Sequence, residues 1–572
     1  VKSPQRFQIK VGRESKVGQR LGSYWSKHYR DFSPRLIFPT EKMKSISVPA
    51  YKKVERLALL VMADLAQHKA YLDPDSMKAG IRKRCLEYLL QFWRERNFRA
   101  EDEQKETHPS EPQTLPSTFE PQHDLGELRR TFLHRFPTKS PSALGQPSAI
   151  HSLQTSASRK GFCCNRPPSA AAAIPITLLH PIFNEFKADC ETHQPTREDN
   201  TLALELSNAM SAFFSNEKAR QTEFIEVLAR HHLHMAPAEI VGTSYCTDAD
   251  MRCNGFPYII GELKHEMGSK GAEPVFQSAV YYTSHLRQQK RLNPHSRSLA
   301  SFCATLGFVG LAFTDRTNIQ VLEQPIRLDY HHTDVKLRTM TARYFGALRK
   351  ATDKLRRYYE CDLPKLEALG SAVGSDARLP YYSLYHDLAD SVERSTRYSS
   401  QPMPDKLIFF GESDGTKVCV KFATRYSRET HIRCASMGIA PTLRGFEALP
   451  GGWFMVVMDR IDDVFMPLYT SESSLTFELR NLVLKKTTLL HQAGYVHGDL
   501  RDTNLMVRKD GQSGFMLVDF DWAGKIGEVC YPMNVNTDPA LGRPAGAYDG
   551  EVIKADHDME MLRKIFEGLR VE

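Results

Sequence analysis

Three polar residues near the end of the chain have the types and the spacing that phosphoryl transfer requires. Asp499 and Asn504 belong to the run H-G-D-L-R-D-T-N at 497–504, and Asp519 follows the apolar run F-M-L-V at 515–518. Phosphoryl transfer needs metal ions across the phosphates and a group that orients the attacking hydroxyl. Carboxylate and amide side chains supply both, so we expect phosphotransferase chemistry here.

The segments around these residues predict ordered elements that hold the loop in place. Residues 482–490 have the apolar spacing of a helix, and residues 505–507 and 515–518 read as two short strands separated by a polar turn. The loop at 497–504 therefore lies between a helix and a strand.

This pattern resembles the catalytic centre of protein kinases. The resemblance implies that Asp499 is the catalytic base and that Asn504 and Asp519 bind Mg²⁺. Arg501 stands where protein kinases usually have a lysine that contacts the γ-phosphate. Gly498 replaces the arginine of the usual H-R-D form, as it does in aminoglycoside and choline kinases.

The preceding segment resembles the small lobe of the same fold. Lys421, in V-C-V-K-F, matches the strand lysine that holds the α- and β-phosphates of ATP, and Glu429 is expected to pair with it. Residues 453–458 predict the strand that enters the adenine hinge, which implies that Met458 and Asp459 border the nucleotide.

The resemblance has departures that bear on turnover. Residues 410–415, F-G-E-S-D-G, are not a G-x-G-x-x-G loop, Asp521 replaces the glycine of D-F-G, and no A-P-E follows. The last helical pattern resembles the central helix of the large lobe, with either Asp556 or Asp558 in its acidic position. A domain that binds nucleotide without turnover is therefore the alternative.

A second group of charged residues lies near the middle of the chain. Glu262 and Lys264 close an apolar strand pattern at 257–263 and share one face of it, because alternate residues of a strand point to the same side. Asp250, in the preceding strand-turn, is expected to join them. Two carboxylates can bind Mg²⁺ and the lysine can polarise a water, which is the chemistry of phosphodiester hydrolysis.

This layout resembles the PD-(D/E)xK restriction-endonuclease-like superfamily over about residues 196–328. Gln277 matches a glutamine often found on the next helix, and the acid of the first helix is either Glu198 or Glu205. The alternative is that Glu262 and Lys264 form an ordinary solvent-exposed ion pair, because the E-x-K pattern is short and occurs by chance in charged proteins.

The fold class expected from these patterns is multidomain α+β. Helical patterns occur twice between 196 and 230 and again at 274–289, and strand patterns occur at 257–263, 303–313 and 318–322. The expected regions are a basic and helical N-terminal region (1–100), a disordered linker rich in Pro and Ser (101–170), an α/β restriction-endonuclease-like domain (196–330), a helical connector (331–376) and a two-lobed protein-kinase-like domain (377–572).

Composition excludes few partners. The net charge of +8 permits a nucleic-acid partner without requiring one. The 11 cysteines lack a C-x-x-C pair and favour reduced thiols in the cytoplasm or nucleus. No apolar run of about 18 residues occurs, so no membrane partner is expected. The chain begins at Val1, and a signal missing from it would leave secretion to a host open.

The combination of both domains resembles the fungal-type protein kinases of mushroom-forming fungi and the crinkler-type effectors. The motifs V-D-F-D-W-A-G at 518–524 and Y-P-M-N-V-N at 531–536 carry this resemblance together with the H-G-D loop. It implies Ser/Thr-type kinase activity with ATP and Mg²⁺, a protein substrate, and DNA as a partner of the nuclease-like domain.

Three alternatives stay open at this point. The first is a Mg²⁺-dependent nuclease or DNA-binding protein that a pseudokinase domain regulates. The second is a phosphotransferase that acts on a small molecule, because the H-G-D form suits a small acceptor. The third is a pair of binding modules in which neither site turns over.

Overall fold

The computed structural model describes residues 125–568 except for ten short gaps. The gaps are 157–160, 171–173, 265–270, 289–296, 304–305, 332, 363–377, 404, 472–475 and 538–540. The N-terminal region predicted at 1–100 lies outside the described residues. Residues 125–362 are called the middle domain below, and residues 378–568 the C-terminal domain.

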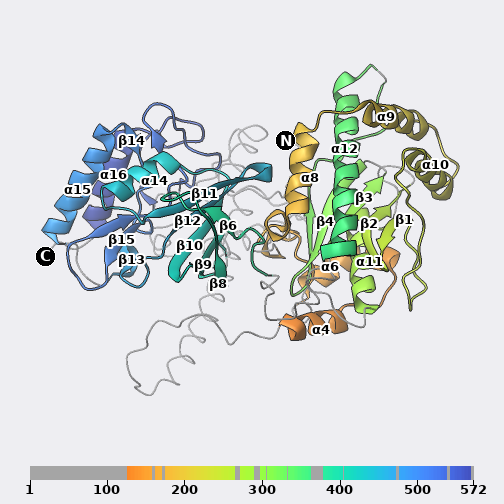
Figure 1. The fold of residues 1–572 in the computed structure, drawn as a ribbon, viewed down its shortest axis with the longest axis horizontal. Coiled ribbons are helices and arrows are strands. Elements are labelled where there is room, and N and C mark those ends of the chain that lie inside the picture. Colours follow the sequence, from red (N-terminus) through yellow and green to blue (C-terminus); the bar gives the residue numbers. More distant parts are fainter. Residues whose placement is uncertain are drawn as a thin grey trace, which may run out of the picture. The chain divides into compact units, whose positions relative to one another are not determined.

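A five-stranded mixed sheet forms the centre of the middle domain (Figure 1). Its strands, in spatial order, are β1 (Ala249–Cys253), β2 (Phe256–Glu262), β3 (Arg297–Cys303), β4 (Leu306–Phe313) and β5 (Thr317–Val321). β2 and β3 are parallel, and the other neighbouring pairs are antiparallel. The parallel pair needs a crossover, which α11 (Pro274–Gln288) provides.

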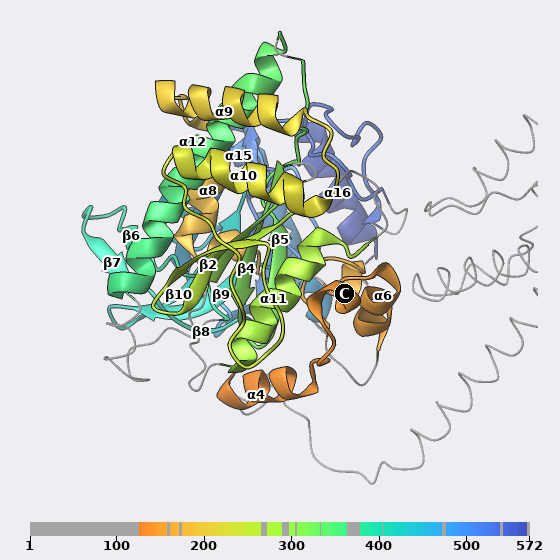
Figure 2. The same ribbon diagram turned by 90° about the vertical axis from the view of Figure 1, so that its right-hand side faces the viewer.

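Helices pack on both faces of this sheet (Figure 2). On one face, Phe276 and Val280 of α11 pack with Ile260 and Val309 of the strands. On the other face, Phe308 packs with apolar residues of two long helices. The helices that contact that face are α7 (Ile176–Leu179), α8 (Pro181–Thr192) and α12 (Val335–Arg357). α9 (Arg197–Met210) packs on α12, and α10 (Glu217–Arg230) packs on α9.

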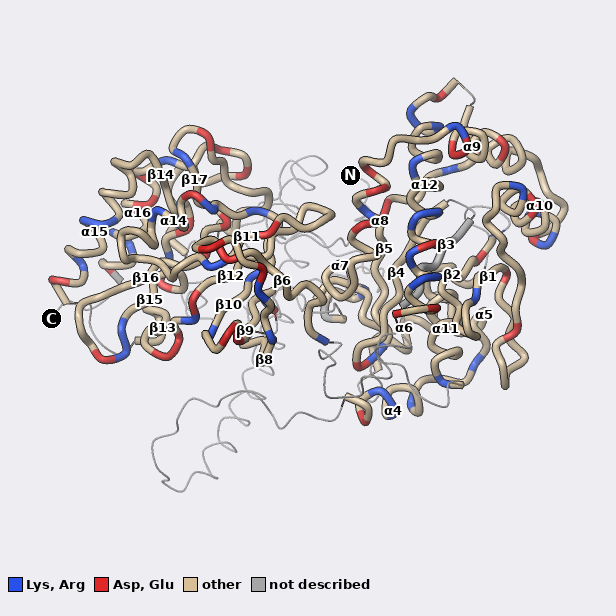
Figure 3. Tube along the Cα trace, viewed as in Figure 1, with Lys and Arg blue, Asp and Glu red and all other residues tan. Residues whose placement is uncertain are grey.

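The helix predicted as a connector belongs to the middle domain. α12 buries Tyr344, Phe345 and Leu348 against the core, and a short π-helical turn (Tyr358–Asp362) follows it. Lys and Arg residues recur along α12 (Figure 3). Lys350 and Lys354 pair with acidic residues of α8. Residues 333–362 are therefore part of the folded unit, and 363–377 lie outside the described residues.

Part of the predicted disordered linker is folded, so that prediction was wrong for residues 125–156. They form α4 (Leu125–Arg135), α5 (Pro141–Leu144) and α6 (Pro147–Thr155). Apolar residues are sparse there, but Phe132, Phe136 and Leu153 join the cluster beneath α11. The guanidinium of Arg287 also donates hydrogen bonds to carbonyls at the end of α4. Tertiary contacts thus order a segment whose composition alone favours disorder.

The small lobe of the C-terminal domain is an antiparallel sheet with one short helix. The spatial order is β11 (Leu443–Leu449), β12 (Trp453–Asp459), β10 (Thr416–Ala423), β9 (Ile408–Ser413) and β8 (Arg397–Ser400). The helix α14 (Arg428–Ser436) follows β10, and a hairpin of β6 (Leu384–His386) and β7 (Glu393–Ser395) precedes the sheet.

The large lobe packs two helices around short hairpins. α15 (Phe477–Gln492) and α16 (Ala555–Gly568) contact each other, and Val483, Leu490 and Leu562 are buried in their core. The strands are β13 (Phe465–Pro467), β15 (Leu505–Arg508) and β16 (Phe515–Leu517) in one sheet and β14 (Tyr495–Val496) and β17 (Gly524–Lys525) in another.

Two negative findings apply to the described residues. None of their helices combines the length and apolar character needed to cross a membrane. The cysteines whose side chains the structure describes, which leaves out Cys303, form no disulfide.

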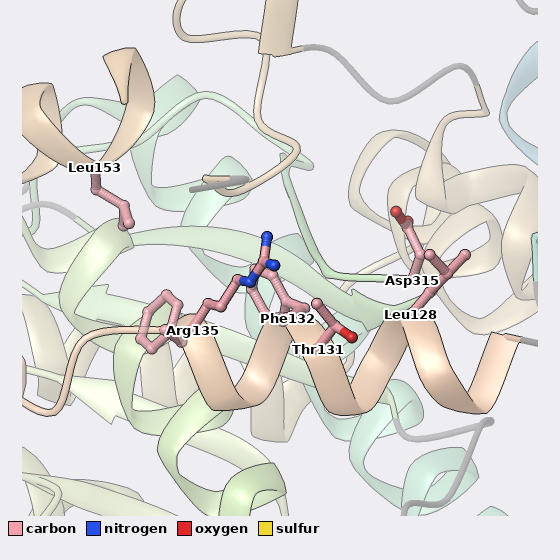
Figure 4. Close-up of a pocket in the computed structure, with 7 residues that line it drawn as sticks. Leu128, Thr131, Phe132, Arg135, Leu153 and Asp315 are labelled. Atoms are coloured by element: carbon pink, nitrogen blue, oxygen red, sulfur yellow. The ribbon is translucent and has the colours of Figure 1, made fainter. Parts of the chain in front are cut away.

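A pocket of about 240 Å³ lies against α4, with Phe132 and Leu153 in its wall and Arg135 and Asp315 among its polar lining (Figure 4). It shares no residue with either candidate site described below.

Candidate active sites

The loop at 497–504 is fastened to α16 through its backbone. The amides of His497 and Gly498 each donate to the carboxylate of Asp558 at 2.8 Å, and His491 lies 3.1 Å from the same group. Asp558 is 1% exposed, whereas Asp556 is exposed. The sequence left these two acids undecided, and the structure decides for Asp558.

Gly498 has a conformation that accounts for the missing arginine of the H-R-D form. Its φ is +81°, in the left-handed region that favours glycine. A Cβ atom there would lie 2.8 Å from the carbonyl oxygen of Trp522. Any side chain at this position would clash with the backbone that follows the D-F-D turn.

The carboxylate of Asp499 is surrounded by cationic and amide donors. Arg501 donates to Oδ2 at 2.7 Å, and the side-chain amide of Asn504 donates to Oδ2 at 3.1 Å and to the backbone carbonyl at 2.9 Å. Arg543 donates to Oδ1 at 2.7 Å. The predicted residues Asp499, Arg501 and Asn504 are therefore in direct contact, and Arg543 is an addition.

Asp519 contacts the small lobe through Lys421. The ammonium group of Lys421 lies 2.6 Å from a carboxylate oxygen of Asp519 and 2.6 Å from one of Asp521. Asp519 has a φ of +71°, which is uncommon for a residue other than glycine and is typical of strained functional positions. The strand lysine and the D-F-D turn thus form one cluster.

Burial and Lys421 act in opposite directions on the two carboxyls. Burial raises the pKa of Asp521 to about 6, and Lys421 offsets part of that rise. Burial also opposes ionisation of Asp519, but the adjacent Lys421 ammonium holds the pKa of Asp519 below its usual value. Asp519 is therefore the carboxylate that stays ionised and suited to a cation.

Phe520 fixes the turn between these two carboxyls. Its ring stacks on the buried imidazole of His431 in α14, with centroids 4.6 Å apart and planes 10° from parallel, and contacts His497 at 5.2 Å. His497 also lies 3.1 Å from the carbonyl of Val518. This stack links the helix of the small lobe to the catalytic loop.

The predicted pair of Lys421 and Glu429 does not form in the structure. The side chain of Glu429 is 65% exposed and lies 3.3 Å from the hydroxyl of Tyr495 and 3.8 Å from Lys525. α14 begins at Arg428, so Glu429 lies in its first turn, and Lys421 pairs with Asp519 and Asp521 instead.

The two predicted hinge residues lie at the end of β12. Met458 is buried opposite Cys419, and Cys419 shares a strand face with Lys421, so Met458 and Lys421 face the same side of the sheet. Asp459 is bound by Arg444 at 2.7 Å.

The loop beside Lys421 is not the segment expected from the sequence. Lys421 pairs with Ile408, so the β8–β9 connection at 401–407 borders it. Residues 410–415 end in a tight Asp414-Gly415 turn, roughly 17 Å along the strand from Lys421. Lys406, in the β8–β9 connection, lies close enough to Asp519 to help lower its pKa.

In the middle domain, Glu262, Lys264 and Gln277 come together as predicted. The ammonium of Lys264 contacts Glu262 and donates to the side-chain oxygen of Gln277 on α11 at 3.1 Å. Glu262 is completely buried, and its Oε2 has no hydrogen-bond partner. Burial, followed by the charge of Asp248, raises the pKa of Glu262 to about 8.

Asp250 does not join this cluster, so its prediction was wrong. Its carboxylate is held by Thr247 at 3.1 Å and by Arg252 at 2.9 Å. A bulge in β2, at Tyr258, places Ala249 opposite Gly261, so the next residue, Asp248, lies opposite Glu262. Asp248 accepts a hydrogen bond from the amide of Leu263 at 2.8 Å.

Neither predicted acid of the first helix reaches the cluster. Glu198 pairs with Arg349, and Glu205 lies beside Arg230 and His231. Glu217, in the first turn of α10, is instead close enough for its charge to raise the pKa of Glu262. Within the described part of the chain, no group of three or more His, Cys, Asp or Glu is placed to bind a metal.

Comparisons with known proteins give few matches. No protein-family model matches the sequence, and neither does any curated protein. Among solved structures, the Cydia pomonella granulovirus kinase PK-1 is 13% identical with a TM-score of 0.23, and vaccinia related kinase 3 is 14% identical with a TM-score of 0.25. The matches cover 28% and 35% of this chain and 64% and 70% of those proteins, so the chain spans under two thirds of the first.

Proposed function

We propose that the C-terminal domain is an ATP-dependent phosphotransferase of the protein-kinase type that acts on Ser or Thr hydroxyls of a protein. The observation that carries the proposal is the contact of Lys421 with Asp519, which joins the small-lobe strand to the D-F-D turn. That turn follows Val518, whose amide donates to the carbonyl of Asn504 in the loop that holds Asp499. Three features thus lie close together: the loop that Asp558 holds in place, the carboxylate of Asp519 and the ammonium of Lys421. This arrangement suits phosphoryl transfer.

The donor set fits ATP with Mg²⁺. Lys421 is already a cation between two carboxylates, and Asp519 and Asn504 offer the oxygen ligands that Mg²⁺ prefers. Bound there, the ion would neutralise phosphate charge. Lys421 would then contact the phosphates, and Met458 and Asp459 would border the adenine.

The remaining residues act on the acceptor. Its hydroxyl oxygen forms a bond to the γ-phosphorus, the bond from that phosphorus to the bridging oxygen breaks, and ADP leaves. Asp499 orients the hydroxyl and takes its proton, and Arg501, 2.7 Å from Asp499, stabilises the transferring phosphoryl group.

The test is transfer of ³²P from γ-labelled ATP with Mg²⁺ to the protein itself and to a generic protein acceptor. We expect Asp519→Asn to lower incorporation by at least about a hundredfold, because it removes a preorganised charge from the site. Asp510→Asn, an exposed acid in the same domain that pairs with Arg508, is the matched control and should label like wild type.

Label that survives Asp519→Asn would contradict the proposal. Absent label in wild type, with ATP binding intact by thermal shift, would indicate a nucleotide-binding regulator. Transfer to a small hydroxyl compound but to no protein would move the assignment to a small-molecule phosphotransferase.

For the middle domain we propose a Mg²⁺-dependent nuclease, and DNA as its partner. What supports this is the unpartnered Oε2 of Glu262 beside Asp248 and Lys264, because a buried carboxylate oxygen without a donor suits a cation. Asp248 and Glu262 would hold the ion, and Lys264, oriented by Gln277, would polarise the attacking water.

Cleavage of plasmid DNA with Mg²⁺ tests this second proposal. Lys264→Ala and Asp248→Asn should each abolish nicking, whereas Asp250→Asn should retain it per folded molecule, because Asp250 is bound by Arg252 and lies outside the cluster. Loss of nicking in Asp250→Asn alone, or nicking that survives Lys264→Ala, would contradict the arrangement.

A further inference from the structure

Arg543 reaches the catalytic loop from a part of the chain that the sequence analysis did not connect with it. It lies between Gly542 and Pro544, in the irregular segment that precedes α16. Its guanidinium side chain is 6% exposed, donates to Asp499 at 2.7 Å and lies 4.5 Å from the centre of the Trp522 ring. Lys564 of α16 donates to its backbone carbonyl at 3.3 Å.

This contact completes the set of donors around Asp499. Arg501 and Asn504 occupy Oδ2 from within the same loop, and Arg543 occupies Oδ1. A catalytic base must be within hydrogen-bond reach of the proton that it accepts. Arg543 therefore occupies the position from which the hydroxyl of an acceptor would approach Oδ1 of Asp499.

The guanidinium cannot leave this position without another partner. It is buried between a carboxylate and an indole ring, and its Nε also donates to the backbone carbonyl of Asn536 at 3.3 Å. That carbonyl carries no net charge to balance the cation, and a buried cation without an ionic partner is strongly destabilising. A carboxylate or phosphate group on the acceptor would replace Asp499 as partner, and guanidinium binds both groups with two hydrogen bonds. A basic acceptor would bring a like charge toward Arg501 and Arg543.

We propose that Arg543 selects the acceptor: it covers Asp499 in the resting site and moves onto an anionic group next to the acceptor hydroxyl. The acceptor class is therefore a Ser or Thr flanked by acidic or phosphorylated residues. This inference rests on the proposed phosphotransferase function and specifies its substrate. Arg543 is a specificity residue, whereas the charge on Asp519 is required for every acceptor.

Binding tests the inference without turnover. We would titrate the full-length protein by calorimetry with a peptide in which glutamates flank alanine at the acceptor position, and with its arginine-flanked counterpart. Wild type should bind the acidic peptide about tenfold more tightly or better, and Arg543→Gln should remove that preference. Arg563→Gln, an exposed α16 arginine paired with Glu567, is the matched control and should retain it.

Transfer provides the second readout, with serine in place of alanine. Arg543→Gln should raise the KM for the acidic peptide about tenfold and equalise kcat/KM between the two peptides, and Arg543→Lys should restore part of the preference because it keeps the charge. A purely structural role would lower kcat for both peptides alike.

The outcomes separate the two proposals. No transfer by any variant, with Arg543-dependent binding of the acidic peptide, would overturn the phosphotransferase and leave the anion site. Equal binding of both peptides by wild type, a comparison that needs no variant, would overturn the inference about Arg543. A preference that persists in folded Arg543→Gln would overturn it as well.

Discussion

Asp558→Ala is expected to lower phosphoryl transfer strongly and to destabilise the C-terminal domain. The carboxylate accepts hydrogen bonds from the backbone amides of His497 and Gly498 and contacts His491, and Asp558 is 1% exposed. Its removal leaves buried donors without acceptors, which costs about 3 kcal/mol or more in free energy of unfolding. The loop would lose its position, so transfer should fall by about a thousandfold. Thermal melting and ³²P incorporation measure the two effects.

Two variants make this result specific to the buried carboxylate. Asp558→Asn keeps an oxygen that can accept one amide and should lie between wild type and alanine in both measurements. Asp556→Ala removes the exposed acid two residues earlier and should behave like wild type. Equal effects of Asp556→Ala and Asp558→Ala would show that helix charge, rather than the fastened loop, is responsible.

The residues predicted most reliably are those close together in sequence. Asp499, Arg501 and Asn504 lie within one loop of six residues, and the structure brings them into contact. Glu262 is the last residue of β2 and Lys264 follows two positions later, so their contact is also a local one. Local geometry alone is sufficient for such groups.

The acid that joins Glu262 is Asp248 rather than Asp250, and the register that decides this is not visible in the sequence. Counting back from the Asn254-Gly255 turn without a bulge places Asp248 opposite Gly261. The bulge at Tyr258 of β2 shifts the register by one residue and places Asp248 opposite Glu262. A bulge exchanges the residues that face each other across a strand pair, and no residue type at this position announces it.

Contacts between distant segments were the ones that sequence reasoning missed. Arg543 lies 44 residues from Asp499 in a segment without periodicity, so nothing in the pattern connects them. The displaced loop beside Lys421 was missed for another reason. Because β8 is short and polar, its sequence does not indicate a strand. The turn after β9, at 410–415, was therefore taken for the phosphate-covering loop in place of the β8–β9 connection.

Lys421→Met should remove nearly all transfer and lower stability, with a second substitution separating the two effects. Without the ammonium, Asp519 and Asp521 face each other unpaired, which costs about 2 kcal/mol because their side chains are 35% and 32% exposed and partly solvated. Adding Asp521→Asn removes the repulsion, so the melting temperature should recover. Transfer should stay about a thousandfold below wild type, because the proposed phosphate contact is still missing.

Lys417→Met, on the same strand and paired with exposed Asp463, is the matched control and should change neither quantity. Recovery of transfer in the double variant would instead mean that Lys421 serves to neutralise the turn and does not contact the nucleotide.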